Sequence, residues 1–386
     1  MLEILEVIPG VMQEEKLVVE DETRNHFRAF MIGHLQQPVL NIISLCAEEK
    51  DLGTRRTFQI IRCFESWLML DTPDDTKATI HANSAIDLCF KELGAVDGCN
   101  AEASDALMSL LLICKDYEKH QTLYNKVLQN LLSSENHLFT LFHDNMVEEV
   151  RCYIDVYNTF VVNAFSEFLK NPQHDVIKVL FHRIFLKLYQ SKHLVTVSRI
   201  NGVFISILRQ LEDEDDVVPT LGTIELRKQF VYAHKEFFEE VIKTGCRHCA
   251  LTQEQVKFYQ DHGFDEEMDD IDFEDKMVIR LDIKRFLRKL IKHFTFDNCF
   301  RPIAGKLVTT FNTLKEGKTE KLICQLEGEF FCAHALLKFG NNKDASCIKT
   351  VQDLLTVVIS NQTPFHSLIC ISLKIISAAS AYLADK

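Results

Sequence analysis

The chain has 386 residues, of which 47% are hydrophobic, and it contains 28 phenylalanines but only 13 glycines and 7 prolines. So few turn-forming residues in a chain of this length indicate long helices joined by short connections. The net charge of −13 disfavours direct binding to nucleic acid or to an anionic membrane, because both require a basic surface. We therefore expect basic proteins as partners, with no direct binding to nucleic acid and no binding to a membrane.

The thirteen cysteines are dispersed, and many fall inside helical patterns, which is typical of reduced thiols that pack as small hydrophobic side chains. The first residues are acidic and lack the basic region of a signal peptide. No uninterrupted run of 18 apolar residues occurs; the last predicted helix comes closest, and Lys374 interrupts it. These features predict a protein of the cytosol or nucleus.

Apolar residues recur with the 3.6-residue period of an amphipathic helix almost throughout, whereas the two-residue period of strands is nearly absent. The sequence therefore predicts an all-α protein. Its helices form seven antiparallel pairs, in chain order over residues 24–70, 76–115, 118–170, 174–211, 221–296, 298–339 and 346–383. The two helices of each pair are 24–49 with 54–70, 76–93 with 101–115, 118–142 with 145–170, 174–191 with 193–211, 221–260 with 276–296, 298–316 with 319–339, and 346–361 with 364–383. Helix pairs that recur every 40–50 residues or so are typical of an α-solenoid with HEAT-type or armadillo-like repeats. We expect one array over residues 1–386, with about seven repeats in a right-handed superhelix; the alternative is a large compact helical bundle.

Two helices show the pattern most clearly. In the helix of residues 54–70, Trp67 shares a face with Phe64 and Leu68 and is predicted to lie in the core. In the helix of residues 276–296, one stripe is apolar and the remaining surface is strongly basic. The basic residues of that helix are Arg280, Lys284, Arg285, Arg288, Lys289 and Lys292.

Three short motifs resemble ligand sites, and each lacks part of the required pattern. "KEGKT" would end a phosphate loop, but Asn312 stands where that loop needs glycine. "CRHC" (Cys246 to Cys249) has no second pair of zinc ligands, and "DDIDFEDKMVIR" lacks the central glycine of a calcium loop. No catalytic Ser-His-Asp or Cys-His arrangement recurs. We therefore predict no enzyme activity, no cofactor and no metal.

The most unusual segment is 264–275, in which eight of twelve residues are acidic. We predict that it is a loop between two helices of one repeat. It is either a solvated connection or a surface that binds a basic partner through salt-dependent attraction. In the second case Arg280, one turn into the next helix, is expected to hold the end of the loop through an exposed ion pair. The candidate partner-binding residues are Asp269, Asp270, Asp272, Glu274, Asp275 and Arg280.

Several motifs resemble, in order along the chain, the transportin-SR and importin-13 branch of the β-karyopherins, within the importin-β superfamily. "IIRCFESWLML" followed by "DTPDD" resembles the Leu-Arg-Cys-Phe-x-Ser-Trp run and short loop of that branch. The upstream segment 2–27 also fits. "EASD" at Glu102 to Asp105, "RHC" at 247–249, the acidic segment, "FRPIAGKL" and "TLKEG" then follow in the order of the family.

This resemblance implies a nuclear transport receptor of the importin type that shuttles between cytoplasm and nucleus through nuclear pores. The implied partners are Ran-GTP, arginine/serine-rich splicing factors or other basic cargo, and phenylalanine-glycine nucleoporins. Members of the branch are more than twice as long. The resemblance therefore implies a middle portion or a short relative, with Ran-GTP binding weakened by missing N-terminal repeats. A helical-repeat scaffold or adaptor unrelated to nuclear transport is the alternative.

Overall fold

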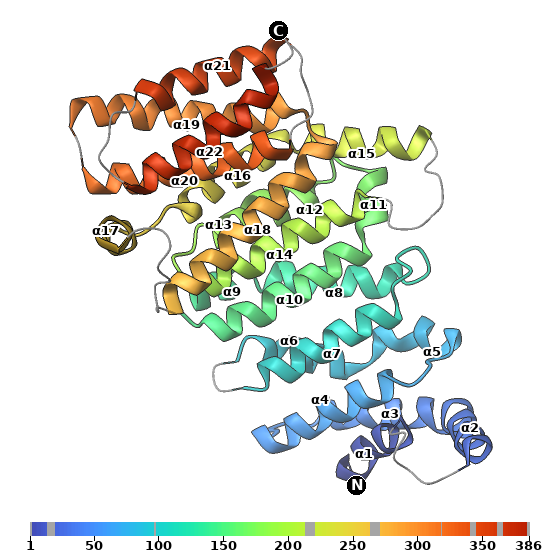
Figure 1. Ribbon diagram of the computed structural model, residues 1–386. Helices are drawn as coiled ribbons and strands as arrows, with labels where there is room; N and C mark the ends of the chain where they lie inside the picture. Colours follow the sequence, from blue (N-terminus) through green and yellow to red (C-terminus); the bar gives the residue numbers. More distant parts are fainter. Residues whose placement is uncertain are drawn as a thin grey trace. The chain divides into compact units, whose positions relative to one another are not determined.

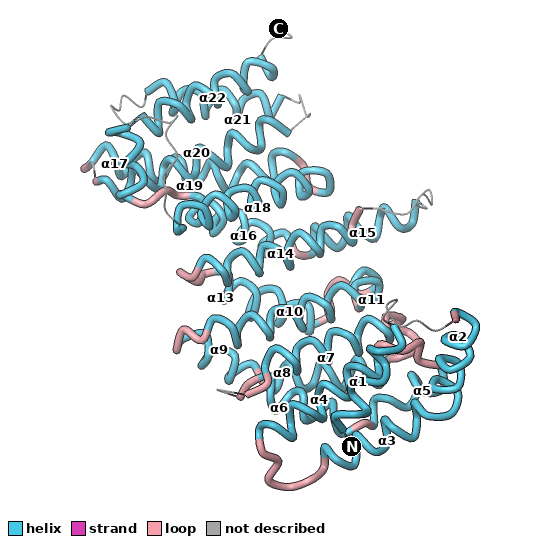
Figure 2. Tube along the Cα trace, turned by 60° about the horizontal axis from the view of Figure 1, so that its bottom comes forward, coloured by secondary structure: helices cyan, strands magenta, loops and turns pink. Residues whose placement is uncertain are grey.

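The computed structural model describes residues 2–13, 20–95, 98–212, 221–262, 271–317, 319–339, 345–360 and 366–383. The chain is all-helical, with 86% helix and about 20 helices packed in contact, and the described residues contain no strand. Figure 2 shows the helices joined mostly by short loops. The predicted all-α class is thus confirmed. The chain divides into two compact units, Met1–Glu167 and Phe168–Lys386, and each is described by itself.

Unit 1 is built from helices that pack on their neighbours in sequence (Figure 1). The helix α4 contacts α1, α3, α6 and α7, and α7 in turn contacts α6 and α10. Each amphipathic helix thereby buries its apolar stripe between the helices before and after it. The elements are α1 Leu2–Gln13, α2 Asp21–Phe30, η1 Met31–Leu35, α3 Gln36–Ala47, α4 Thr54–Leu68, α5 Asp74–Thr79, η2 Ile80–Ala82, α6 Ser84–Leu93, α7 Asn100–Ile113, α8 Gln121–Ser133, α9 Glu135–His143, α10 Val147–Asn163 and the first half of α11 Phe165–Lys170, whose second half belongs to unit 2.

Unit 2 is centred on α18 and α20, which contact each other (Figure 1). The helix α18 also packs on α14 and α16, and α20 packs on α16, α19 and α22. The elements are α12 Asp175–Lys178, η3 Val179–Phe185, α13 Leu186–Tyr189, α14 Leu194–Gln210, α15 Leu221–Ala233, α16 Lys235–Cys249, α17 Gln253–His262, α18 Ile271–His293, α19 Phe296–Glu316, α20 Glu320–Phe339, α21 Ala345–Ser360 and α22 His366–Leu383. Packing of helices in sequence order within each unit is consistent with an α-solenoid.

The structure corrects several predicted helix boundaries. The helix predicted over residues 221–260 is three helices, α15, α16 and α17, which break near His234 and at Ala250–Thr252. The helix predicted from residue 276 begins at Ile271. The helix α1, which contains Pro9, lies before the first predicted pair.

Trp67 lies in the core of unit 1, as predicted. Its side chain is 0% exposed, and its Nε1 donates a 2.8 Å hydrogen bond to the backbone oxygen of Leu5 in α1. Its own backbone oxygen accepts a 2.8 Å hydrogen bond from Nε2 of Gln36 in α3. Trp67 therefore joins three helices, through its indole to α1 and through its backbone oxygen to α3.

Candidate functional site

The acidic segment 264–275 lies partly outside the described residues. Asp269 and Asp270 are outside them, and Asp272 lies in the first turn of α18, where only its backbone is described. Glu274 and Asp275 are exposed residues of α18. The predicted loop therefore does not extend to residue 275, because its last five residues are helical. Acidic side chains stabilise the first turns of a helix through the helix dipole, which explains this early start.

Arg280 is buried rather than exposed, which corrects the predicted ion pair with the end of the acidic segment. It is 6% exposed, and its Nη2 and Nη1 lie 2.6 and 3.3 Å from the carboxylate oxygens of Glu327 in α20. Its guanidinium also lies 4.2 Å from the ring centroid of Phe331. Arg280 faces α20 because it lies one helical position from the apolar stripe residue Ile279, and this buried position makes it a structural residue.

The "CRHC" motif packs into the core of unit 2. Cys246 and Cys249 are fully buried, and contacts with their sulfurs, together with burial, raise the pKa of the Cys332 thiol well above its usual range. His248 is hydrogen-bonded through Nε2 to the backbone oxygen of Tyr189 at 2.6 Å, and burial lowers its pKa to about 4. Across the described part of the chain, no three His, Cys, Asp or Glu side chains are grouped to hold a metal ion.

A cavity of about 440 Å³ lies between α16, α19 and α20 and is lined by Lys306, Thr310 and Gln325 among others. Next to it, the fully buried carboxyl of Glu329 accepts 2.9 Å hydrogen bonds from Thr310 and Gln325. Burial raises the pKa of Glu329 and lowers that of Lys306. Nζ of Lys306 donates to the backbone oxygen of Lys243 at 2.6 Å. These bonds connect α16, α19 and α20.

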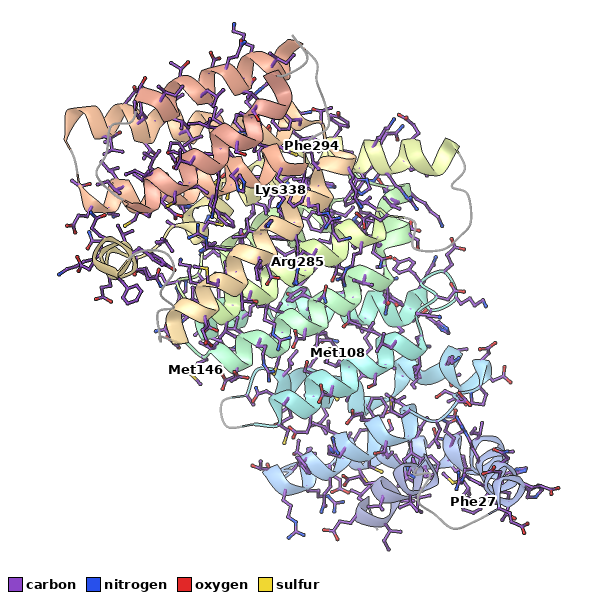
Figure 3. All side chains as sticks on the ribbon, in the orientation of Figure 1. Phe27, Met108, Met146, Arg285, Phe294 and Lys338 are labelled. Atoms are coloured by element: carbon purple, nitrogen blue, oxygen red, sulfur yellow. The ribbon has the colours of Figure 1, made fainter. Side chains whose placement is uncertain are left out.

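The strongest candidate for a binding surface is a cluster of cations on α15, α18 and α20, which we call the basic face. Figure 3 marks Arg285 of α18 and Lys338 of α20 in this region. Lys284 is half-buried and the other four members are exposed. Positive charge gathers here although the chain as a whole carries −13. The basic face consists of Lys228, Lys284, Arg288, Lys292 and Lys338.

Few carboxylates compensate this charge. Glu212 accepts hydrogen bonds from Lys289 and, at 2.9 Å, from Lys292. The neighbouring Arg285 pairs with Asp282 of α18 at 3.2 Å. Within the described ranges, Lys292 is the only member of the basic face that pairs with a carboxylate. The other four cations are therefore available to an acidic partner.

Two of the cations lie over an aromatic ring. Nζ of Lys284 is 5.9 Å from the ring centroid of Phe339, and Cζ of Arg288 is 5.4 Å from the same centroid. A cation over a ring is attracted by the negative face of the π-system. Phe339, the last residue of α20, thus interacts with both side chains.

The basic face borders a pocket of about 660 Å³. We call it the aromatic pocket. Its wall combines two cations of the basic face, Lys228 and Lys292, with rings from α15, α19 and α20 and from the connection between α18 and α19. The ring centroids of Tyr232 and Phe294 lie 5.6 Å apart, and Tyr232 is 47% exposed. The aromatic residues that line the pocket are Tyr232, Phe294, Phe296 and Phe339.

The sequence contained one signal for this surface. Lys284, Arg288 and Lys292 are spaced by four residues, so they share one side of a helix. The aromatic pocket gave no such signal, because its rings come from three helices and from the connection after α18, and they meet only in the folded unit.

The stretch Asp21–Ala47, which comprises α2, η1 and α3, is long and apolar enough to cross a membrane by length and composition alone. In the sequence pattern, the segment that came closest to a membrane span was the last predicted helix instead. Core helices of soluble proteins and signal sequences have the same length and composition. The stretch is therefore weak evidence for a membrane span.

No family model matches the chain, and no curated protein matches it in a sequence search. The resemblance to the β-karyopherins rests on the order of the motifs named above.

Proposed function

We propose that the chain is a nuclear transport receptor of the importin type, or the middle portion of one, built as a HEAT-type solenoid. The observation that carries the proposal is the packing of helices in sequence order within each unit, with charged residues on the exposed surfaces. Helical-repeat proteins of this construction present long binding surfaces. The order of the karyopherin-like motifs supports the transport role.

The proposed mechanism is differential binding without covalent chemistry. Ran-GTP and a basic cargo, such as an arginine/serine-rich splicing factor, would favour different curvatures of the repeat array. Each ligand then lowers the affinity for the other by the same factor, because coupling between two binding sites is reciprocal. Phenylalanine-glycine nucleoporins would bind on a separate surface during passage through nuclear pores.

In this proposal, the acidic segment binds the basic surface of Ran-GTP. Glu274 and Asp275 are exposed and stand in a run of eight carboxylates. Repulsion among so many carboxylates is relieved when lysines or arginines of a partner approach. Because the charges are exposed, the attraction weakens as salt is added.

The proposal is tested by changing Asp269, Asp270 and Asp272 together to asparagine. We expect the affinity for Ran-GTP to fall about 10-fold at low salt, with a shallower salt dependence and an unchanged helical content. The control is a triple variant, Glu20→Gln, Glu22→Gln and Asp144→Asn, which removes three exposed acidic charges from unit 1.

Two results would contradict the proposal. Equal affinity and equal salt dependence in the wild type and the acidic-segment variant would leave the segment as a solvated connection. If the unmodified chain bound none of Ran-GTP, an arginine/serine-rich peptide or phenylalanine-glycine repeats, the chain would instead be a scaffold unrelated to nuclear transport.

A further inference from the structure

We propose that the basic face and the aromatic pocket of unit 2 together bind an acidic protein segment that carries a bulky apolar side chain. The carboxylates of the segment would meet the lysines and Arg288 at the rim, and its apolar side chain would enter the pocket. This partner is opposite in charge to the basic cargo proposed above, so the inference is independent of the transport role.

The charge argument begins with the uncompensated cations. Lys228, Lys284, Arg288 and Lys338 make no ion pair with any carboxylate that the structure describes. Lys284 and Lys338 also lie close enough to His334 to lower its pKa, although burial is the larger cause. Like charges held near one another repel, and an acidic ligand relieves that repulsion.

The aromatic pocket supplies the apolar half of the site. Its volume of about 660 Å³ is ample for a phenylalanine, leucine or tryptophan side chain. Tyr232 is 47% exposed although its ring packs edge-on against Phe294. Binding energy at protein interfaces concentrates where an aromatic or aliphatic side chain fills a desolvated pocket that polar residues surround. Lys228 and Lys292 provide such surroundings.

An acidic peptide fits this surface better than a nucleic acid does. Both are anionic, and both can stack on exposed rings. A long polyanion, however, also meets the rest of a chain that carries −13, and it needs a continuous basic track. A short segment experiences mainly the charges within a Debye length of about 10 Å at 0.1 M salt.

The test uses the full chain and two fluorescent peptides measured by anisotropy. One peptide carries six carboxylates around a single phenylalanine, and the other has alanine in place of that phenylalanine. We expect saturable binding of the first peptide, about 10-fold weaker binding of the second, and a loss of affinity for both as salt is added.

Three variants locate the site. The double change Arg288→Glu and Lys292→Glu should weaken both peptides about 10-fold or more. Tyr232→Ala should weaken only the peptide that carries phenylalanine. Lys349→Glu changes an exposed lysine of α21 outside the site and should leave both affinities unchanged, while circular dichroism reports on the fold of each variant.

The proposal fails if the wild-type chain shows no saturable binding at low salt. It also fails if Lys349→Glu weakens binding as much as the double variant, because the attraction would then be unspecific. Equal competition by a single-stranded oligonucleotide of the same charge would reassign the surface to nucleic acid. Weak Ran-GTP binding would leave the inference untouched, since the peptide experiment does not involve Ran.

Discussion

Arg280 illustrates how a charged residue becomes part of a core. Arg280 and Glu327 are 6% and 3% exposed, and two hydrogen bonds join the guanidinium to the carboxylate. Phe331 covers the guanidinium on one face. Water is replaced here by a fixed partner, so each charge depends on the other for its solvation.

Replacing Glu327 with glutamine should destabilise unit 2 by about 3–5 kcal/mol, because Arg280 would remain buried without a counter-charge. The double change Arg280→Met and Glu327→Leu should recover most of that loss, since two apolar side chains of similar volume need no solvation. Urea denaturation followed by circular dichroism measures both effects. A Glu327→Gln variant as stable as the wild type would show that the pair is not buried in solution.

The second prediction at this scale concerns His234, which is 2% exposed and packs against Phe181, Phe230 and His182. Burial lowers its pKa to about 4, although the hydrogen bond that the imidazole donates to the backbone oxygen of Pro172 acts in the opposite direction. In the unfolded chain the pKa of histidine is about 6.5. Below that pH the unfolded state binds more protons, so stability falls as the pH drops from about 6.5 towards 4.

We expect this histidine to lower the free energy of unfolding by about 1–3 kcal/mol between pH 7 and pH 5. Urea denaturation at the two pH values measures the change through the shift of the unfolding midpoint. His234→Gln should reduce the pH dependence, whereas the same change at the exposed His26 should not. An equal pH dependence in the wild type and His234→Gln would show that His234 titrates normally.

At the scale of elements, a close crossing between α20 and α16 in unit 2 depends on a glycine. A Cβ atom at Gly328 of α20 would lie 2.5 Å from the backbone nitrogen of Ala250 and 2.6 Å from the backbone oxygen of Cys246. These are backbone atoms at the end of α16, so they cannot rotate away. The contact of α20 with α16 therefore requires a residue without a side chain at position 328. The burial of Cys246, Cys249 and Cys332 around this contact has the same requirement.

Gly328→Ala should destabilise the protein by about 1–3 kcal/mol, since the added methyl group overpacks the crossing. Gly305 of α19 is a matched control, because a Cβ there has no neighbour within 4 Å. Gly305→Ala should be stabilising by about 0.5–1 kcal/mol through its higher helix propensity. Thermal denaturation of the two variants measures both effects. Equal melting temperatures of the two variants would contradict a close contact between Gly328 and the backbone of α16.

At the scale of the whole molecule, the first and last helices carry apolar residues that no other part of the described chain covers. In α1, Ile4 and Val7 are 67% and 55% exposed, and in α22, Leu373 is 61% exposed. Exposed apolar groups of this kind favour association. We expect self-association that increases with concentration in sedimentation velocity experiments, and Ile4→Lys with Leu373→Lys should reduce it. A wild-type chain that stays monomeric at high concentration would contradict this expectation.

The proposed solenoid predicts an elongated particle. A compact protein of this length has a radius of gyration of roughly 21 Å, and a stack of repeats must exceed it because each pair contacts only its neighbours. Small-angle scattering of the monomer gives the value directly. A radius near the compact figure would favour the large helical bundle.

The sequence by itself determined the helical class and most helix boundaries. The predicted helix of residues 298–316 agrees closely with Phe296–Glu316, and the one of 346–361 agrees with Ala345–Ser360. Trp67 was correctly placed in the core. These successes have one reason: the 3.6-residue apolar period is a local property, and a helix buries its stripe whichever neighbour covers it.

Only the tertiary structure decided which charges are buried and which rings meet. Arg280 and Arg288 occupy the same helix and have similar local patterns, yet one pairs with Glu327 inside unit 2 and the other lies exposed beside Phe339. Their difference depends on α20, which begins forty residues after Arg280. The aromatic pocket likewise combines rings from three helices with Phe294, which follows α18. Contacts between residues distant in sequence depend on how helices cross, and periodicity along a single helix carries no information about that crossing.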